Sequence, residues 1–199
     1  DPQHISCYQL TVHEGTPFHH RRLQGRLLEL GESRQGELYE LVHTELSSAG
    51  YSAYEVSNFA KTKAGRSRHN QKYWDHTPYL GAGLAAHSFS GRRRWWNEPD
   101  FEEYCGRVEG GERPLAGSEE LSDAELALEA VMLGLRRSAG LDLERLRTVY
   151  GVNLLERNAA LIERYVEDGV AVADGRLRLT SRGFAVADAV VRSLDLGLD

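Results

Sequence analysis

Two strand-like segments separated by an amphipathic helix occupy the first sixty residues, and this order constrains the fold more than any other feature. Residues 4–12 (HISCYQLTV) and 53–59 are rich in β-branched and aromatic residues. Between them, apolar residues recur at helical spacing over 35–49, and Gly50 stands at the expected helix end. A strand, a helix and a strand in this order predict a parallel sheet with a helical crossover.

A third strand is predicted over residues 79–84, and three strands cannot close a barrel. Open strand edges pair with other chains, so we expect further polypeptide to cover them, either the preceding half of the same protein or a partner. Met132 is the sole methionine, so Asp1 is not an encoded start. We therefore expect the chain to be part of a longer protein.

The segment between the second and third predicted strands is strongly basic, and so are residues 92–94 after the third strand. From Lys61 to Arg94 there are eight basic residues against Asp75 alone, a charge of +7 in a chain of net charge −6. A positive, aromatic-rich segment in an acidic protein fits a flat anionic ligand, and a solvated basic loop is the alternative. In parallel α/β folds such ligands sit at the carboxyl ends of strands.

The sequence changes character after Asn97. Residues 98–118 combine a short helix with Gly110, Gly111 and Pro114, and predict a linker. Residues 119–199 predict a capped helix after Ser122, helices over 142–151 and 153–169, a hairpin around Asp174-Gly175 and a last helix over 182–194. We thus expect domains at 1–97 and 119–199, the second winged-helix-like and largely helical, giving an α/β plus α protein.

A winged-helix-like module raises the question of nucleic acid binding, which its charge argues against. Residues 119–199 hold ten arginines and no lysine against fifteen carboxylates. Binding to phosphates depends on neutralising their charge. We therefore expect no nucleic acid partner, and interpret the module as a packing, lid or protein-interaction domain.

The cysteines and the hydropathy pattern place limits on the setting of the protein. Cys7 and Cys105 are far apart and form no metal-type pair, which fits a reduced cytosolic environment. No apolar run approaches the length of a membrane span, and no signal peptide precedes the first strand. The expected location is the cytoplasm, with membrane association only through a partner.

Seven segments, taken together, resemble the radical S-adenosylmethionine proteins related to oxygen-independent coproporphyrinogen III oxidase. They are HISCYQLTVHEGTPF, YEVSNFA, SRHNQKYW, YLGAGLAAHS, RRWWN, EAVMLGLR and RLRLTSRGF, in the order of that family and over nearly the whole chain. The HNxxYW pattern, formed here by His69, Asn70, Tyr73 and Trp74, favours the heme chaperone and related methyltransferase branches over the true oxidases.

The resemblance implies a fold and a set of cofactors. Residues 1–97 would be the C-terminal strands of a partial (β/α) radical S-adenosylmethionine barrel. The family holds a 4Fe-4S cluster through a CxxxCxxC motif, which this chain lacks, so its metal ligands and most S-adenosylmethionine contacts would lie in the N-terminal barrel half. This stretch alone would neither assemble the cluster nor cleave the cofactor.

The resemblance also suggests a heme site on the HNxxYW segment. His69 is the candidate iron ligand, because an imidazole ligates heme iron, and Tyr73 and Trp74 offer flat apolar area. Arg66, Arg68 and Lys72 would pair with propionates, with Asn70 beside them. The alternative is that His69 and Asn70 only hydrogen-bond the loop backbone.

Other candidates follow the predicted strand ends. The resemblance places Thr11 and His87 beside S-adenosylmethionine, with barrel packing as the alternative, and Glu55 and Asn58 would orient a ligand or satisfy loop amides. Residues 92–94 (RRR), followed by Trp95 and Trp96, would clamp an anionic edge or form a solvated turn.

Three functions compete on these observations. The first is a heme carrier that transfers heme to respiratory enzymes through an acceptor protein. The second is a radical enzyme that decarboxylates coproporphyrinogen III or methylates a substrate, which leaves enzymatic activity of the longer protein open. The third is a non-catalytic interaction module. The HNxxYW segment and the basic region favour the first.

Overall fold

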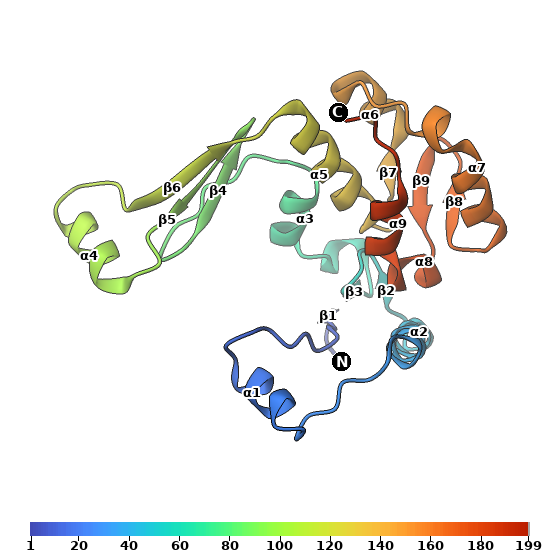
Figure 1. Cartoon of the computed structure of the whole chain (residues 1–199), viewed down its shortest axis with the longest axis horizontal. Coiled ribbons are helices and arrows are strands. Elements are labelled where there is room, and N and C mark those ends of the chain that lie inside the picture. Colours follow the sequence, from blue (N-terminus) through green and yellow to red (C-terminus); the bar gives the residue numbers. More distant parts are fainter. Residues whose placement is uncertain (199) are drawn as a thin grey trace.

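The computed structural model describes residues 1–198 and shows a mixed α/β protein built on small sheets (Figure 1). Three sheets of three strands each occur in it, with strand orders β1-β3-β2, β4-β5-β6 and β7-β9-β8. The main hydrophobic core lies in the C-terminal part, around Val131, Leu135, Leu146 and Leu177. The predicted α/β plus α class is therefore confirmed at this level.

The N-terminal sheet differs from the predicted parallel arrangement. It contains β1 (His4–Ser6), β2 (Ser52–Ala53) and β3 (Asn58–Ala60), and β3 pairs antiparallel with both neighbours. The predicted strand over 53–59 is broken in two because Val56 donates its amide to the carbonyl of Arg136 instead of to a strand. β1 and β2 still run in the same direction, as the helical crossover requires, but β3 separates them.

Two helices follow β1 in the chain. The shorter, α1 (Pro17–Leu23), is capped by Thr16, whose hydroxyl accepts the amide of His19. The longer, α2 (Glu32–Ser48), confirms the predicted helix and ends before Gly50, which has a positive φ of 84°. The predicted strand over 4–12 ends at Ser6, and residues 7–13 are irregular.

An arm projects from the molecule, and the sequence prediction missed its sheet (Figure 1). The arm consists of β4 (His87–Ser90), β5 (Arg93–Asn97), α4 (Phe101–Glu109) and β6 (Leu115–Glu120), with the strands antiparallel. The predicted strand over 79–84 is wrong, since only Tyr79 forms a bridge, to Phe89. The predicted linker over 98–118 holds α4 and most of β6, so it is structured.

The C-terminal unit, defined here as α5 to α9 with the sheet β7-β9-β8, follows the predicted order of helices and hairpin. Its elements are α5 (Asp123–Leu135), β7 (Leu141–Asp142), α6 (Leu143–Tyr150), α7 (Leu154–Glu167), β8 (Ala171–Ala173), β9 (Arg176–Leu179), α8 (Ser181–Ala185) and α9 (Ala187–Ser193). The predicted capping box of Ser122 and Glu125 is present. The hairpin turns at Gly175, which has a positive φ of 83°.

Two details of this unit differ from the prediction. The last helix is broken at Val186, whose φ of −121° is not helical, so α8 and α9 are separate. Asn153 does not cap α7, because its amide donates to the Glu156 carboxylate at 2.7 Å instead of accepting a backbone amide. All three helices are nevertheless held by their buried apolar residues.

Candidate functional site

The HNxxYW segment forms a short helix, α3 (Arg68–Trp74), preceded by a single 3-10 turn (Lys63–Gly65). Ser67 caps α3, and its hydroxyl accepts the amide of Asn70 at 3.2 Å. The hydroxyl of Thr62 caps the preceding turn in the same way, at Gly65. Two serine and threonine caps in succession thus explain why a basic loop adopts helical turns here.

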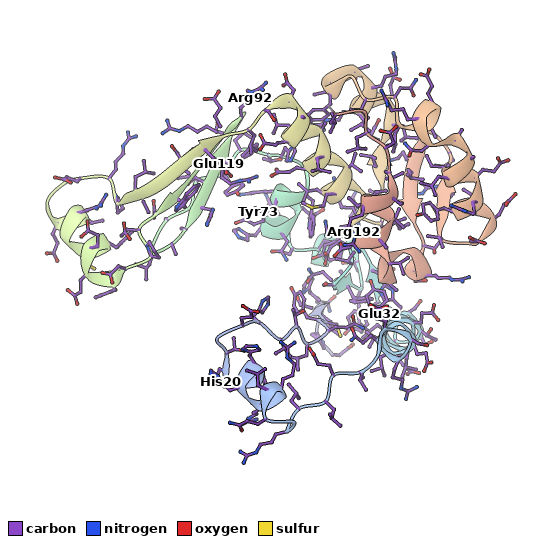
Figure 2. All side chains as sticks on the ribbon, viewed as in Figure 1. His20, Glu32, Tyr73, Arg92, Glu119 and Arg192 are labelled. Carbon is purple, nitrogen blue, oxygen red and sulfur yellow. The ribbon has the colours of Figure 1, made fainter. Side chains whose placement is uncertain are left out.

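Helical spacing brings His69 and Tyr73 together on one exposed face of α3. The Tyr73 hydroxyl lies 3.0 Å from His69 Nε2, and the two rings meet edge to face at 5.1 Å between centroids. Tyr79 extends this group, 4.6 Å from Tyr73 and also edge to face. Figure 2 shows Tyr73 on α3, on the side of the molecule that faces the arm. An exposed imidazole thus lies against one phenol ring, which in turn packs on a second.

The basic residues beside this face are placed differently from one another. Arg66 lies over the ring of Tyr54, with 5.4 Å between its guanidinium carbon and the ring centroid. Arg68 and Lys72 are exposed. Their side chains form no ion pair within residues 1–198. These two charges remain available to an anionic group.

The arginine triplet does not form the predicted anion clamp. Arg92 pairs with Asp123 and also donates to the carbonyl of Leu121 at 3.1 Å, while Arg94 pairs with Glu119 and Glu129. Figure 2 shows Arg92 and Glu119 where the arm meets α5. Alternation along β5 turns Arg93 to the other face, over Trp95. The charges of Arg92 and Arg94 therefore attach the arm to the C-terminal unit.

Trp74 faces away from His69 and Tyr73. It lines a small cavity of about 70 Å³ together with Arg137, Gly140, Leu141 and Tyr150 of the C-terminal unit. Its Nε1 is buried and has no hydrogen-bond partner among residues 1–198. The structure thus brings His69, Tyr73 and, through α3, Asn70 together, but places Trp74 at a junction between elements.

Residues just after α3 contact the C-terminal unit directly. Asp75 forms an ion pair with Arg137. His76 Nδ1 lies 3.2 Å from the Tyr150 hydroxyl, and His76 Nε2 lies 3.3 Å from a carboxylate oxygen of Glu129. Burial lowers the pKa of His76, opposed by Glu129 and assisted by Arg94 and Arg145. The histidine is therefore held in its neutral form at neutral pH.

The YEVSNFA segment supports the other end of α3. The Tyr54 hydroxyl accepts the amide of Ser67 at 3.2 Å and lies 2.8 Å from His4 Nε2. Glu55 and Asn58 are almost completely buried, at 1% and 3% exposure, and the Glu55 carboxylate accepts the amide of Ser57 at 3.1 Å. Burial raises the pKa of Glu55. The Glu55 contact matches the predicted alternative in which this side chain satisfies a loop amide, whereas the Asn58 side chain accepts from the Ser6 hydroxyl at 2.5 Å.

The structure separates Thr11 from His87. Thr11 is exposed and lines a cavity of about 640 Å³ between the 7–12 segment and α2, whose other walls include Leu38, Tyr39 and Phe59. His87 belongs to the sheet of the arm, where its ring stacks on Trp96 at 5.7 Å. Thr11, in the irregular segment after β1, and His87, in the sheet of the arm, thus lie in different parts of the fold.

The two cysteines lie on separate elements of the structure. Cys7 follows β1 and Cys105 lies in α4 on the arm, and both are free thiols. Within residues 1–198, no group of three or more His, Cys, Asp or Glu side chains is arranged to hold a metal ion. Of the described helices, none is sufficiently long and apolar to cross a bilayer.

Sequence reasoning missed Glu129, Arg137 and Tyr150, the residues that hold the end of α3. They lie more than fifty positions after it, in a segment assigned by pattern to a separate module. Local spacing carries no signal for such a contact. A half-buried network of this kind becomes visible only when the helices are packed.

Comparison with known proteins relates the chain to one group. Residues 121–186 match the family described as HemN C-terminal domain. The chain is 40% identical over 192 residues to heme chaperone HemW of Mycobacterium tuberculosis, covering 96% of the chain and 47% of that protein. It is 30% identical over 191 residues to heme chaperone HemW of Bacillus subtilis, covering 96% and 50%. The chain therefore spans about half the length of these curated relatives.

A mitochondrial relative and a solved structure extend the comparison. The bovine radical S-adenosyl methionine domain-containing protein 1 is 31% identical over 210 residues, covering 96% of the chain and 46% of that protein. The structure of coproporphyrinogen III oxidase (HemN) from Escherichia coli, described as a radical SAM enzyme, superimposes with a TM-score of 0.67. It covers 96% of the chain and 48% of the oxidase at 14% identity, which indicates a shared fold.

Proposed function

Because the chain belongs to the HemW/HemN-like family, we propose that it is the C-terminal part of a heme chaperone, which binds heme and transfers it to respiratory enzymes. The observation that carries this proposal is the 40% identity to a heme chaperone over 96% of the chain. The likeness to the oxidase is 14% in sequence and concerns the fold alone. The HNxxYW pattern also favours a chaperone, so an oxidase-like radical enzyme is the second candidate.

The exposed face of α3 is the proposed heme site. His69 would ligate the iron, and the rings of Tyr73 and Tyr79 would lie against the porphyrin. Arg68 and Lys72 would pair with propionates, since neither forms an ion pair among the described residues, while Arg66 would first have to leave the ring of Tyr54. Asn70 would lie on α3 beside Arg68 and Lys72, and Trp74 would support α3 from the opposite side.

Ligation by His69 Nε2 has a structural consequence. The Tyr73 hydroxyl lies 3.0 Å from this nitrogen, so it occupies the position that the iron would take. Heme binding through Nε2 therefore requires the hydroxyl to move away. Removing it, while keeping the ring, is expected to strengthen heme binding.

S-adenosylmethionine and a 4Fe-4S cluster are proposed as cofactors of the longer protein. The cluster ligands would come from the N-terminal barrel half, since Cys7 and Cys105 do not converge. Thr11 is the residue of this chain that would contact S-adenosylmethionine, because it lines the 640 Å³ cavity beside α2. Bound in this cavity, S-adenosylmethionine would supply radical chemistry or regulate the longer protein. His87 is better explained by its stacking on Trp96.

The barrel, the winged-helix-like domain and the protein partner are also proposed. Residues 1–97 would complete a partial (β/α) barrel with the preceding half, and residues 119–199 would form a winged-helix-like domain after a 98–118 segment. The order α5, β7, α6, α7, β8, β9 supports the second proposal, since a hairpin follows three helices. A heme-acceptor protein would be the partner, in the cytoplasm or at a membrane.

Heme titration of the purified protein tests the proposed site. A Soret band that saturates at one heme per chain is expected, together with its weakening in His69→Ala but not in His20→Ala, an exposed histidine of α1 that serves as control (Figure 2). Tyr73→Phe is expected to bind heme about two- to tenfold more tightly, since one neutral hydrogen bond is lost. An unchanged affinity in His69→Ala would remove this residue from the site.

The second candidate is tested with the longer protein carrying its cluster. Incubation with S-adenosylmethionine, a reductant and coproporphyrinogen III is expected to leave the substrate unchanged. Formation of protoporphyrinogen would replace the chaperone assignment by the oxidase.

A further inference from the structure

We propose that the C-terminal unit is a latch that positions α3, and that Arg137, Glu129 and Tyr150 are positioning residues for the candidate heme site. The latch comprises the Asp75–Arg137 ion pair and the contacts of His76 with Tyr150 and Glu129. This inference rests on the proposed function, because it assigns regulation to the same site. None of the three residues of the C-terminal unit belongs to the exposed face that would contact heme.

The length of α3 explains why it needs such support. It has seven residues, and an isolated helix of this length is unstable in water because nucleation is costly. Its exposed face contributes little packing beyond the contact of Tyr73 with Tyr79, since both His69 and Tyr73 are exposed. The position of the helix therefore depends on contacts at its two ends.

The first end is tied to the N-terminal sheet. The Tyr54 hydroxyl accepts the amide of Ser67, the residue that caps α3, and Tyr54 itself is buried at 4% exposure. Tyr54 is in turn bound to the C-terminal unit, since its carbonyl accepts both the amide of Ser138, at 3.1 Å, and the Ser138 hydroxyl, at 3.2 Å. Even this end is thus anchored through the residues that follow α5.

The second end contacts side chains of the C-terminal unit, and the His76 ring also lies 5.6 Å from the ring of Phe89 in the arm. Asp75, the C-cap of α3, pairs with Arg137, which lies two residues after α5. His76 has a positive φ of 52°, a conformation that few non-glycine residues adopt without support. Its ring lies between the Tyr150 hydroxyl, 3.2 Å from Nδ1, and the Glu129 carboxylate, 3.3 Å from Nε2. The chain leaving α3 is therefore held in an unfavourable turn by its neighbours.

Glu129 also connects the latch to the arm. Both of its carboxylate oxygens accept from one Arg94 nitrogen at 2.8 Å, while one of them faces His76. Arg94 belongs to β5 and His76 follows α3. The segment after α3, helix α5 and the arm therefore meet at the Glu129 carboxylate. A movement of the arm or of α5 would thus change the contacts that fix α3.

The consequence is a link between the C-terminal unit and heme retention. With the latch closed, His69 is held ready for iron, and with the latch open α3 samples other positions, so the fraction of binding-competent protein falls. A protein that binds the C-terminal unit or the arm could in this way promote heme release. The latch predicts a several-fold weaker heme affinity when it is broken, although every residue that contacts heme is intact.

Amide hydrogen exchange and heme titration of the full protein test the latch. Arg137→Ala and Asp75→Asn each remove one partner of the ion pair. Arg136→Ala is the matched control, because the neighbouring Arg136 pairs with Asp188 of α9 and not with the α3 region. In Arg137→Ala and Asp75→Asn, but not in the control, we expect amides of residues 70–76 to exchange several-fold faster without heme. Heme affinity is expected to fall three- to tenfold.

The charge-reversed pair separates positioning from general damage. Asp75→Arg and Arg137→Asp are each expected to open the latch, and their combination to restore slow exchange and much of the heme affinity. Unchanged exchange in Arg137→Ala and Asp75→Asn would overturn the latch, as would faster exchange with unchanged heme affinity. If the unaltered protein fails to bind heme, both the proposed function and the regulation assigned here are wrong. Amide exchange rates measured without heme would still show whether the C-terminal unit positions α3.

Discussion

The Tyr54 hydroxyl accepts a hydrogen bond from the backbone amide of Ser67, and this contact joins the YEVSNFA segment to the start of α3. Thirteen positions separate the two residues in sequence. The same hydroxyl lies 2.8 Å from His4 of β1, and the Arg66 guanidinium lies over the Tyr54 ring. One buried phenol therefore organises the first strand, the basic loop and the candidate heme helix.

Tyr54→Phe tests this organisation. The substitution keeps the ring but removes the acceptor, so the amide of Ser67 loses its partner and the free energy of unfolding should fall by about 1 kcal/mol. Chemical denaturation measures the change. Tyr8→Phe, at an exposed tyrosine (69%), is the control and should leave stability within about 0.5 kcal/mol. Equal stability of the two variants would contradict a role for the Tyr54 hydroxyl.

Glu55→Gln tests the buried carboxyl through the pH dependence of stability. Burial raises the pKa of Glu55 above its ordinary value of 4.5, so between these two values the folded protein holds a proton that the unfolded chain has lost. The contribution of Glu55 to stability is thus fully present below pH 4.5 and is lost as the pH rises through the folded-state pKa. Each unit of the shift is worth about 1.4 kcal/mol.

The glutamine variant should lack this loss, because its side chain does not titrate and its oxygen still accepts the amide of Ser57. Relative to the unaltered protein, the variant should gain stability as the pH rises from 4 to 7. Denaturant midpoints at several pH values measure the difference. A difference independent of pH would show that Glu55 ionises normally in the folded protein.

Asn158→Ala tests how the C-terminal tail is held. The buried Asn158 amide donates to the carbonyls of Leu154 and Asp195 at 3.0 and 2.8 Å, and its oxygen accepts the amide of Asp195 at 2.8 Å. Loss of this side chain leaves buried backbone groups unpaired, so a loss of about 2 to 3 kcal/mol is expected by thermal or chemical unfolding. Asn153→Ala should cost less than about 0.5 kcal/mol, since Asn153 caps no backbone amide.

Gly117→Ala tests close packing within the arm. A Cβ at this position of β6 would lie 2.5 Å from the Trp96 indole, so the substitution should destabilise the protein by about 1 to 3 kcal/mol. Gly106→Ala in α4 meets no atom within 4 Å and should be neutral or slightly stabilising, because alanine favours helix. Unfolding curves of both variants give the comparison, and similar effects would rule out the Trp96 contact as the cause.

The sequence by itself determined the elements whose signals are local. The capping box at Ser122, the left-handed glycine after α6, the turn at Gly175 and the amphipathic α2 all follow from residues within a few positions of one another. The pairing of His69 with Tyr73 belongs to the same class, since one helical turn separates them. The collinear segments also indicated the family that the comparisons identified.

Only the tertiary structure decided which elements meet. Spacing alone did not reveal that Val56 donates its amide to the carbonyl of Arg136. It also did not reveal that Arg92 and Arg94 are neutralised by Asp123, Glu119 and Glu129. A strand pattern specifies alternation, but its partner and direction depend on residues far along the chain. The net charge of a segment likewise does not show which charges are neutralised, because the ion pairs form only in the folded protein. The anchoring of α3 by the C-terminal unit is therefore a property of the packed molecule, because its partners lie more than fifty positions away.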